Sequence, residues 1–124
     1  MKALSVRNPW AHLIAHEIKT IEVRSWYTKY RGPLLICVSK NRKMGAELAD
    51  SVGELHRFLS HKYYFEDRGH AIAIVDLVDC RRPQPHDEAS SLVCIPKCAW
   101  SWVLANARRI DPFPVKGRLG LFDI

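Results

Sequence analysis

Apolar residues occur along the chain in short alternating or continuous runs, a pattern typical of short strands. The continuous run at Leu34–Val38 suits a buried strand, and the β-branched residues of His70–Cys80 favour a longer one. A break is expected at Pro112–Pro114, because proline lacks the N–H group that a central strand needs. Strands are therefore predicted at Leu4–Val6, Lys19–Trp26, Leu34–Val38, His70–Cys80, Trp100–Ala105 and the end of Val115–Phe122.

Two segments between these strands show helical spacing. Asn8 suits an N-cap and Pro9 the first helical position, and Trp10, Leu13, Ile14 and Ile18 then follow at helical intervals. A second amphipathic helix is predicted further along, although a glycine at position 53 costs it about 1 kcal/mol relative to alanine. Its apolar positions are Leu48, Val52, Leu55 and Leu59.

This order of elements predicts an α+β fold, a small mixed β-barrel flanked by two or three helices. A parallel, doubly wound sheet fits less well, because strands and helices do not alternate regularly. With 124 residues, 48% of them hydrophobic, residues 1–124 are expected to form a single domain with one core. The glycine-rich segment Lys116–Gly120 lacks the spacing of a Walker or dinucleotide-binding loop.

Composition points to a polyanionic partner. The formal net charge of +6 favours RNA or DNA, although charge alone indicates only non-specific association. No stretch approaches the roughly 18–20 apolar residues of a membrane span, so no membrane partner is expected. The N-terminus has no long apolar core typical of a signal peptide, which favours a cytoplasmic protein.

Neither cysteines nor histidines form a convincing metal motif. Cys37 and Cys80 fall in apolar runs and are predicted to be small buried side chains. Cys94, Cys98 and His86 offer three zinc ligands where a structural site needs four, so reduced thiols are favoured. His12 and His16 share a helix face without a third ligand, and a solvated helix face is the favoured interpretation. We therefore expect no metal and no cofactor.

The strand predicted at Lys19–Trp26 carries the most informative chemistry. Thr20, Glu22, Arg24 and Trp26 would share one face, opposite Ile21 and Val23. In a cleft, Glu22 could accept from an exocyclic amine such as cytosine N4, and Arg24 could hold a phosphate. Trp26 or Trp10 could stack on a base, with Lys19 and Lys116 adding positive charge. The alternative is an exposed Glu22–Arg24 pair of at most about 1 kcal/mol and no function.

Three segments together resemble the ASCH family (activating signal cointegrator homology), which has a PUA-like β-barrel. They are Asn8–Ile14, Ile18–Trp26 and Tyr30–Gly32, and Ala73–Cys80 and Phe113–Gly117 are also similar. The family's G-x-K-x-x-E-x-R motif is matched by Lys19, Glu22 and Arg24, with Glu17 in place of its glycine. The resemblance implies a cleft between barrel and helices that accepts nucleic acid or a nucleotide.

The resemblance implies an RNA- or nucleotide-binding module, with DNA as another candidate. Some similar proteins are enzymes, either metal-dependent ribonucleases or amidohydrolases on acylated cytidine, which leaves a hydrolase as the alternative. Lys19 and Glu22 would be its catalytic candidates, and a divalent metal would be needed only by a nuclease. The expected ligand-binding residues are Trp10, Lys19, Thr20, Glu22, Arg24, Ser25, Trp26 and Lys116, with a nucleic-acid rim at Lys29, Arg31, Lys40, Arg42 and Lys43.

Overall fold

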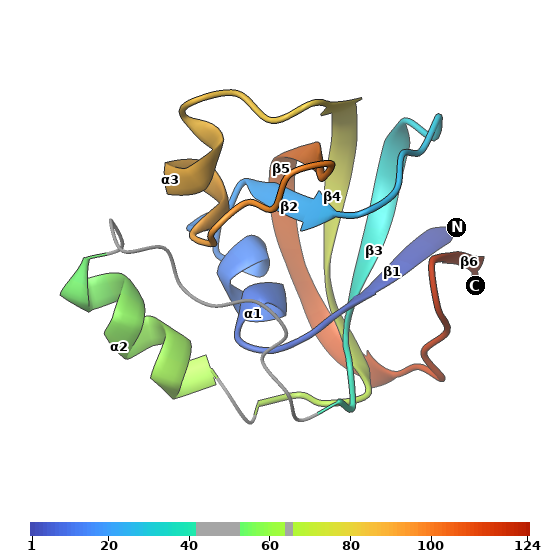
Figure 1. The fold of residues 1–124 in the computed structure, drawn as a ribbon. Helices are drawn as coiled ribbons and strands as arrows, with labels where there is room; N and C mark the ends of the chain where they lie inside the picture. The colour runs from blue at the N-terminus through green and yellow to red at the C-terminus, as the bar shows by residue number, and fades with distance from the viewer. Residues whose placement is uncertain (42–52, 64–65) are drawn as a thin grey trace.

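A six-stranded mixed sheet forms the centre of the protein (Figure 1). The structure is a computed structural model that describes residues 1–41, 53–63 and 66–124. β1 and β3 are parallel and the other neighbouring pairs are antiparallel. The strands are β1 (Lys2–Val6), β2 (Ile21–Arg24), β3 (Gly32–Val38), β4 (His70–Arg81), β5 (Trp100–Pro114) and β6 (Leu121–Asp123), in the spatial order β2-β5-β4-β3-β1-β6. The sheet is a mixed half-barrel flanked by short helices, which confirms the predicted α+β fold class.

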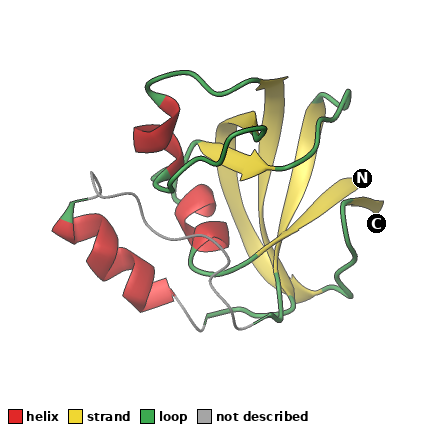
Figure 2. Cartoon of the chain, viewed as in Figure 1, coloured by secondary structure: helices red, strands yellow, loops and turns green. Residues whose placement is uncertain are grey.

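The helices lie on one side of the sheet (Figure 2). They are α1 (Trp10–Ala15), α2 (Glu54–Tyr63) and α3 (Asp87–Ser91). All six residues of α1 are buried, and this helix fills the curved sheet together with Trp102 of β5 and the inward residues of β1, β3 and β4. None of the described helices is long and apolar enough to cross a membrane. The core thus fixes α1, and β2, which carries Glu22 and Arg24, follows it and pairs with β5.

β5 extends further than predicted. It continues through Pro112 and Pro114, where a break was expected, and pairs with β4 as far as His70 opposite Pro114. The reason is that β2 covers only residues Trp100–Val103 of β5. Beyond Val103 none of the described strands pairs with the other edge of β5, and prolines are tolerated in edge positions.

α1 differs from its prediction at both ends. Asn8 does not cap the helix, and its Nδ2 instead donates to the backbone oxygen of Glu66 at 2.6 Å. The helix ends at Ala15, before Ile18, because the chain turns at Glu17, whose φ is 60°. Glu17 therefore adopts the left-handed turn that a glycine would make easily, and its carboxylate accepts a hydrogen bond from the backbone N–H of Ala107 at 3.1 Å.

The two remaining helices were predicted only in part. α2 begins at Glu54, so Gly53 precedes the helix, while Leu48 and Val52 lie outside the described residues. α3 falls in a segment for which no helix was predicted, because it is short and has no apolar periodicity. It is held instead by the buried Asp87, which accepts from Arg81 at 2.6 and 3.1 Å and from Ser101 Oγ at 2.7 Å.

Candidate functional site

Lys19, Glu22 and Arg24 form one charged network. Glu22 Oε2 accepts from Arg24 Nη2 at 3.0 Å and from Arg24 Nε at 3.2 Å. Glu22 Oε1 lies 3.5 Å from Lys19 Nζ, on the opposite side of the carboxylate. Arg24 Nη2 also donates to the backbone oxygen of Ser5 at 2.9 Å, which ties β2 to β1. The three motif side chains therefore lie together in one place.

The three side chains of the network range from fully buried to partly exposed. The side chains of Lys19, Glu22 and Arg24 are 1%, 9% and 24% exposed. Burial lowers the pKa of Lys19, although Glu22 opposes that shift. Burial alone would raise the pKa of Glu22, but the charges of Arg24 and then Lys19 outweigh it, and the pKa lies below its ordinary value. Glu22 is thus a carboxylate at neutral pH, and Arg24 is the member that reaches solvent.

The network lies where two hollows meet. The outer lobe has a volume of about 720 Å³ and is bordered by β1, the end of β3 and segment 115–120. The inner lobe, about 300 Å³, lies against loop 92–99, which passes beside β2 (Figure 1). Both lobes are lined by Trp10, Glu22, Val23 and Arg24. We refer to the two lobes together as the cleft.

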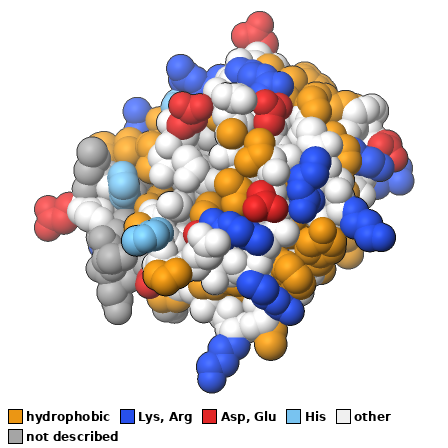
Figure 3. Space-filling view, turned by 90° about the horizontal axis from the view of Figure 1, so that it is seen from above, with side chains coloured by type: hydrophobic (Ala, Val, Ile, Leu, Met, Phe, Trp, Pro, Cys, Tyr) orange, Lys and Arg blue, Asp and Glu red, His pale blue; other side chains and the backbone are white. Residues whose placement is uncertain are grey.

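The outer lobe is basic. Its lining includes Arg7, Arg24, Lys40, Lys116 and Arg118, with Glu22 as its acidic residue. Gly117 brings segment 115–120 close to β1, since a Cβ on it would lie 2.8 Å from Ser5 Oγ. Figure 3 shows several Lys and Arg side chains spread over the upper face of the molecule, with acidic and hydrophobic side chains between them.

Two polar groups in the cleft keep hydrogen-bonding capacity. Among the described residues, nothing accepts a hydrogen bond from Arg24 Nη1. Ser5 Oγ is buried in the wall of the outer lobe and likewise has no partner in the described part of the chain. A ligand with acceptor oxygens in the cleft can accept from Arg24 Nη1, as an anion held by Arg24 would do.

The two tryptophans predicted to stack on a base, Trp10 and Trp26, lie in different surroundings. Trp10 lines both lobes but is only 4% exposed, and Lys19 Nζ lies 5.4 Å from its ring centroid, so its indole is part of the wall. Trp26 lies outside the lining of both lobes and packs edge-on against Trp102, with centroids 4.7 Å apart. The expected alternation fails at Trp26 because β2 ends at Arg24.

Some of the other predicted site residues line the cleft and others do not. Lys40 and Lys116 line the outer lobe and Ser25 the inner one, whereas Thr20 lines a separate small cavity of about 40 Å³. Lys29 and Arg31 lie outside both linings, and Arg31 instead approaches Asp79 at 3.7 Å. Arg42 and Lys43 lie outside the described residues. Sequence reasoning missed Ser5, Arg7 and Arg118, of which only Arg118 carried a signal, its position beside Lys116 in a glycine-rich segment.

Within the described ranges, three potential metal ligands come together at one place, away from the cleft lining. His12, Glu66 and Asp67 each offer an atom within 4.8 Å of the others, and His12 Nε2 lies 3.4 Å from Asp67 Oδ2. His16 does not join them but stacks on Tyr63, as His12 does, with centroids 5.0 Å apart. The His86, Cys94 and Cys98 set does not assemble among the described residues.

Comparison with known families decides the identity of the fold. The sequence profile of the ASCH domain matches residues 4–114. The chain belongs to the ASCH domain family. Activating signal cointegrator 1 of Mus musculus is 28% identical over 119 residues, covering 92% of this chain and 20% of that protein. The human protein of the same name is 34% identical over 80 residues, covering 62% of this chain and 14% of that protein.

The ASCH chain thus spans about a fifth or less of the length of these two relatives. Among solved structures, a mutant of the protein ZmASCH from Zymomonas mobilis superposes with a TM-score of 0.63 over 99% of this chain and 88% of that chain. At 10% identity this similarity supports the fold alone. The motif residues of the cleft are therefore interpreted from their own geometry.

Proposed function

We propose that this ASCH domain binds single-stranded RNA or a nucleotide in the cleft, with a phosphate on Arg24 and a base in the inner lobe. The observation that carries the proposal is the geometry of Arg24. Its Nε and Nη2 are fixed by Glu22 and Ser5, while Nη1 points to no partner among the described residues. A guanidinium held in this way presents donors to a phosphate without losing side-chain entropy on binding.

The shape and charge of the cleft suit the same ligand. Its lobes, about 720 and 300 Å³, fall in the range of small-molecule sites, and the larger one is the basic one. The inner lobe is mostly apolar, with Val93, Pro96 and Ala99 in its lining. A charged phosphate in the outer lobe and a flat base in the inner lobe match this division.

Lys19 and Glu22 are better suited to hold Arg24 than to react. An ammonium group has three N–H donors, and Lys19 directs them to Ser91 O at 2.6 Å, to Glu22 and toward the Trp10 ring. Glu22 accepts from Arg24, Lys19 and the backbone N–H of Val23. The proposal therefore gives Glu22 the role of orienting Arg24, with contact to an exocyclic amine as a secondary role.

The test is the binding of a fluorescein-labelled single-stranded RNA and of cytidine monophosphate to an Arg24→Ala variant. Affinity should fall at least about tenfold, because a hydrogen bond to a charged group contributes about 1.5–3 kcal/mol. The slope of log affinity against log salt should also decrease by about 0.7. The affinity of Arg24→Lys, which keeps the positive charge without the planar guanidinium, should lie between the affinities of the wild type and of Arg24→Ala.

Arg109→Ala provides the matched control, since Arg109 is exposed on β5 and lies outside the cleft lining. It removes the same charge and should leave affinity within about twofold, because a distant surface charge acts only through screened electrostatics. Circular dichroism of each variant verifies that the fold is kept. Equal affinities of Arg24→Ala and the wild type would refute the proposal.

Hydrolysis of RNA or of an acylated cytidine is the second candidate function. It is favoured by Lys19, which lines the inner lobe and whose pKa is lowered by burial, as in many catalytic lysines. Incubation of the protein with RNA and with acylated cytidine, with and without a divalent metal, tests it by mass spectrometry. Product formation that Lys19→Met abolishes would establish an enzyme, and unchanged substrates in all four mixtures would exclude these two reactions.

A further inference from the structure

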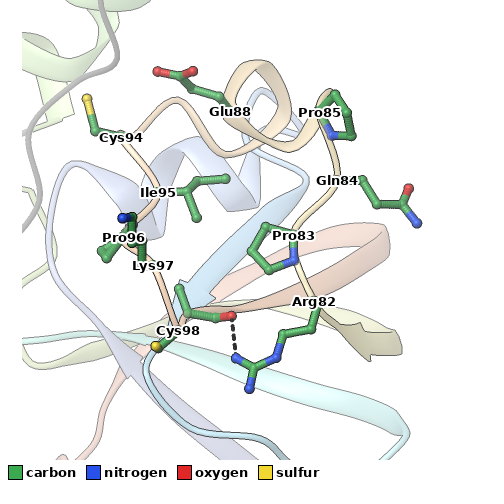
Figure 4. A pocket seen from close by; sticks show the side chains of 11 residues that line it. Arg82, Pro83, Gln84, Pro85, Glu88, Cys94, Ile95, Pro96, Lys97 and Cys98 are labelled. Carbon is green, nitrogen blue, oxygen red and sulfur yellow. Dashed lines mark hydrogen bonds between the residues drawn. The ribbon is translucent and has the colours of Figure 1, made fainter.

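A hollow apart from the cleft, which the proposed function does not use, lies beyond loop 92–99 (Figure 4). Its volume is about 650 Å³. One wall is the segment from Arg82 to Glu88 that follows β4, and the opposite wall is the segment from Cys94 to Ala99 that precedes β5. We call it the 82–99 pocket.

Arg82, which lines this pocket, is held against Trp100. Its guanidinium carbon lies 3.9 Å from the ring centroid of Trp100, and its Nη1 donates to the backbone oxygen of Ala99 at 3.2 Å (dashed line in Figure 4). Trp100 is in turn supported by Tyr27, with centroids 4.9 Å apart. Because Arg82 is exposed and lines the pocket, the guanidinium face turned away from Trp100 is the one available to a ligand.

The other walls combine apolar surfaces with one further positive charge. Pro83 and Ile95 extend toward one another from the two segments in Figure 4, and Pro96 lies beside Ile95. Lys97 contributes an ammonium group, and Glu88, at the far edge in Figure 4, is the acidic residue of the lining. The pocket therefore offers a planar cation and apolar side chains to a flat ligand that has apolar faces and a nearby negative charge.

The 82–99 pocket and the cleft share a wall. Five residues line both this pocket and the inner lobe: Cys94, Pro96, Lys97, Cys98 and Ala99. A strand of nucleic acid that leaves the inner lobe therefore crosses only one loop before it reaches Arg82. Lys97, on the shared loop, is placed to contact the phosphate that crosses.

We propose that the 82–99 pocket is a second base subsite, in which a nucleotide next to the one in the cleft stacks on Arg82. This inference rests on the proposed function and extends its ligand from a nucleotide to a single-stranded oligonucleotide. Arginine guanidinium planes are recurrent stacking partners of unpaired bases, and stacking tolerates any base because each has a π face. A folded duplex would not fit, since its bases are not free to enter two separate hollows.

The experiment compares a mononucleotide with a longer ligand. Affinities are measured for cytidine monophosphate and for a single-stranded RNA of about eight nucleotides, a length within the range of small single-strand-binding domains. Wild-type protein should bind the oligonucleotide at least about tenfold more tightly than the mononucleotide. Arg82→Ala should lose most of this gain while its affinity for the mononucleotide stays within about twofold of wild type.

Two further variants keep the result interpretable. Arg82→Lys retains the charge but not the planar stack, so it should retain the salt dependence of the wild type and still lose most of the length-dependent gain. Arg109→Ala removes an arginine that lies outside the 82–99 pocket and outside the cleft lining, and it should keep the gain in full.

The outcomes separate the two proposals. If wild-type protein binds the mononucleotide but gains nothing with the oligonucleotide, or if Arg82→Ala keeps the gain, the second subsite is refuted and the cleft stands. If wild-type protein binds neither ligand, the proposed function fails and the second subsite fails with it. If Arg82→Ala weakens both ligands equally, Arg82 acts on the fold as a whole and the subsite is again refuted.

Discussion

Replacing Glu22 with glutamine tests the buried network directly. The side chain keeps its size and shape, but the negative charge between Lys19 and Arg24 is lost. Lys19 is then left almost fully buried, since its side chain is 1% exposed, next to the Ser91 carbonyl and the Trp10 ring but without an anionic partner among the described residues. Arg24 loses two hydrogen bonds to a carboxylate but can hydrate through its exposed side. The main cost is therefore the unpaired charge of Lys19.

The expected magnitude follows from this burial. Removing one partner of a buried ion pair costs about 3–5 kcal/mol, whereas an exposed pair contributes about 0–1 kcal/mol. Glutamine still offers an amide oxygen to one neighbour, so we expect Glu22→Gln to lower the free energy of unfolding by about 3 kcal/mol. Lys19→Met removes the ammonium group instead and leaves Glu22 paired with Arg24, so it should cost less.

The assay is denaturant unfolding of the two single variants and the double variant, followed by tryptophan fluorescence at neutral pH. The double variant should be more stable than the sum of the two single effects predicts, by about 2 kcal/mol, because neither charge is then left without its partner. Raising the pH should stabilise Glu22→Gln. Burial lowers the pKa of Lys19 below its ordinary value of 10.5, so the unfolded chain binds the proton more tightly than the folded one.

Two results would refute the reasoning. One is a Glu22→Gln variant whose unfolding free energy lies within about 0.5 kcal/mol of wild type, the range of ordinary surface substitutions. The other is strict additivity in the double variant, which would mean that Lys19 and Glu22 do not interact. Either result would mean that Lys19 and Glu22 are not a buried, energetically coupled ion pair.

Two other predictions concern parts of the chain outside the network. The pKa of Asp87 is lowered from 3.8 to about 2, chiefly by its hydrogen bonds from Arg81, so the stability that it contributes is present above about pH 4 and lost as the pH falls toward 2. Wild-type protein should lose about 2 kcal/mol more than Asp87→Asn over that interval, and parallel acid unfolding curves would contradict this. Burial raises the pKa of the Cys37 thiol to about 11, whereas Cys94 and Cys98 are exposed. Ellman's reagent should therefore react rapidly with the two exposed thiols, and a Cys37→Ala variant that loses a fast-reacting thiol would disprove the assignment.

Local sequence patterns predicted the strands, because each apolar run forms one strand whose side chains are buried in the core. Leu34–Val38 and His70–Cys80 fall within β3 and β4, and the buried Cys37 and Cys80 confirm their interpretation as small apolar side chains. The end of β5 could not be predicted, because the tolerance of Pro112 and Pro114 depends on where the neighbouring strand stops. α3 was also missed, since its stability comes from contacts of Asp87 with β4 and β5.

Strand alternation also predicted part of the candidate site, and that prediction was wrong beyond the end of the strand. Glu22 and Arg24 are two residues apart on one strand, so alternation places them together. Lys19 joins them from before the strand, because the left-handed turn at Glu17 redirects the chain. The same alternation was wrong for Trp26, which lies beyond the end of β2 and packs on Trp102. Arg82 gave no signal, because its place beside the cleft depends on the return of loop 92–99.

The central claim is that a ligand meets Arg24 in the cleft, and a nuclear magnetic resonance titration with cytidine monophosphate tests it most directly. In ¹H–¹⁵N spectra, the side-chain Nε–H of Arg24 and the backbone amides of Ser5 and Gly117 should show the largest shifts. Shifts of these signals that saturate with ligand would support the claim. Saturable shifts confined to other parts of the molecule, or no shifts at millimolar ligand, would contradict it.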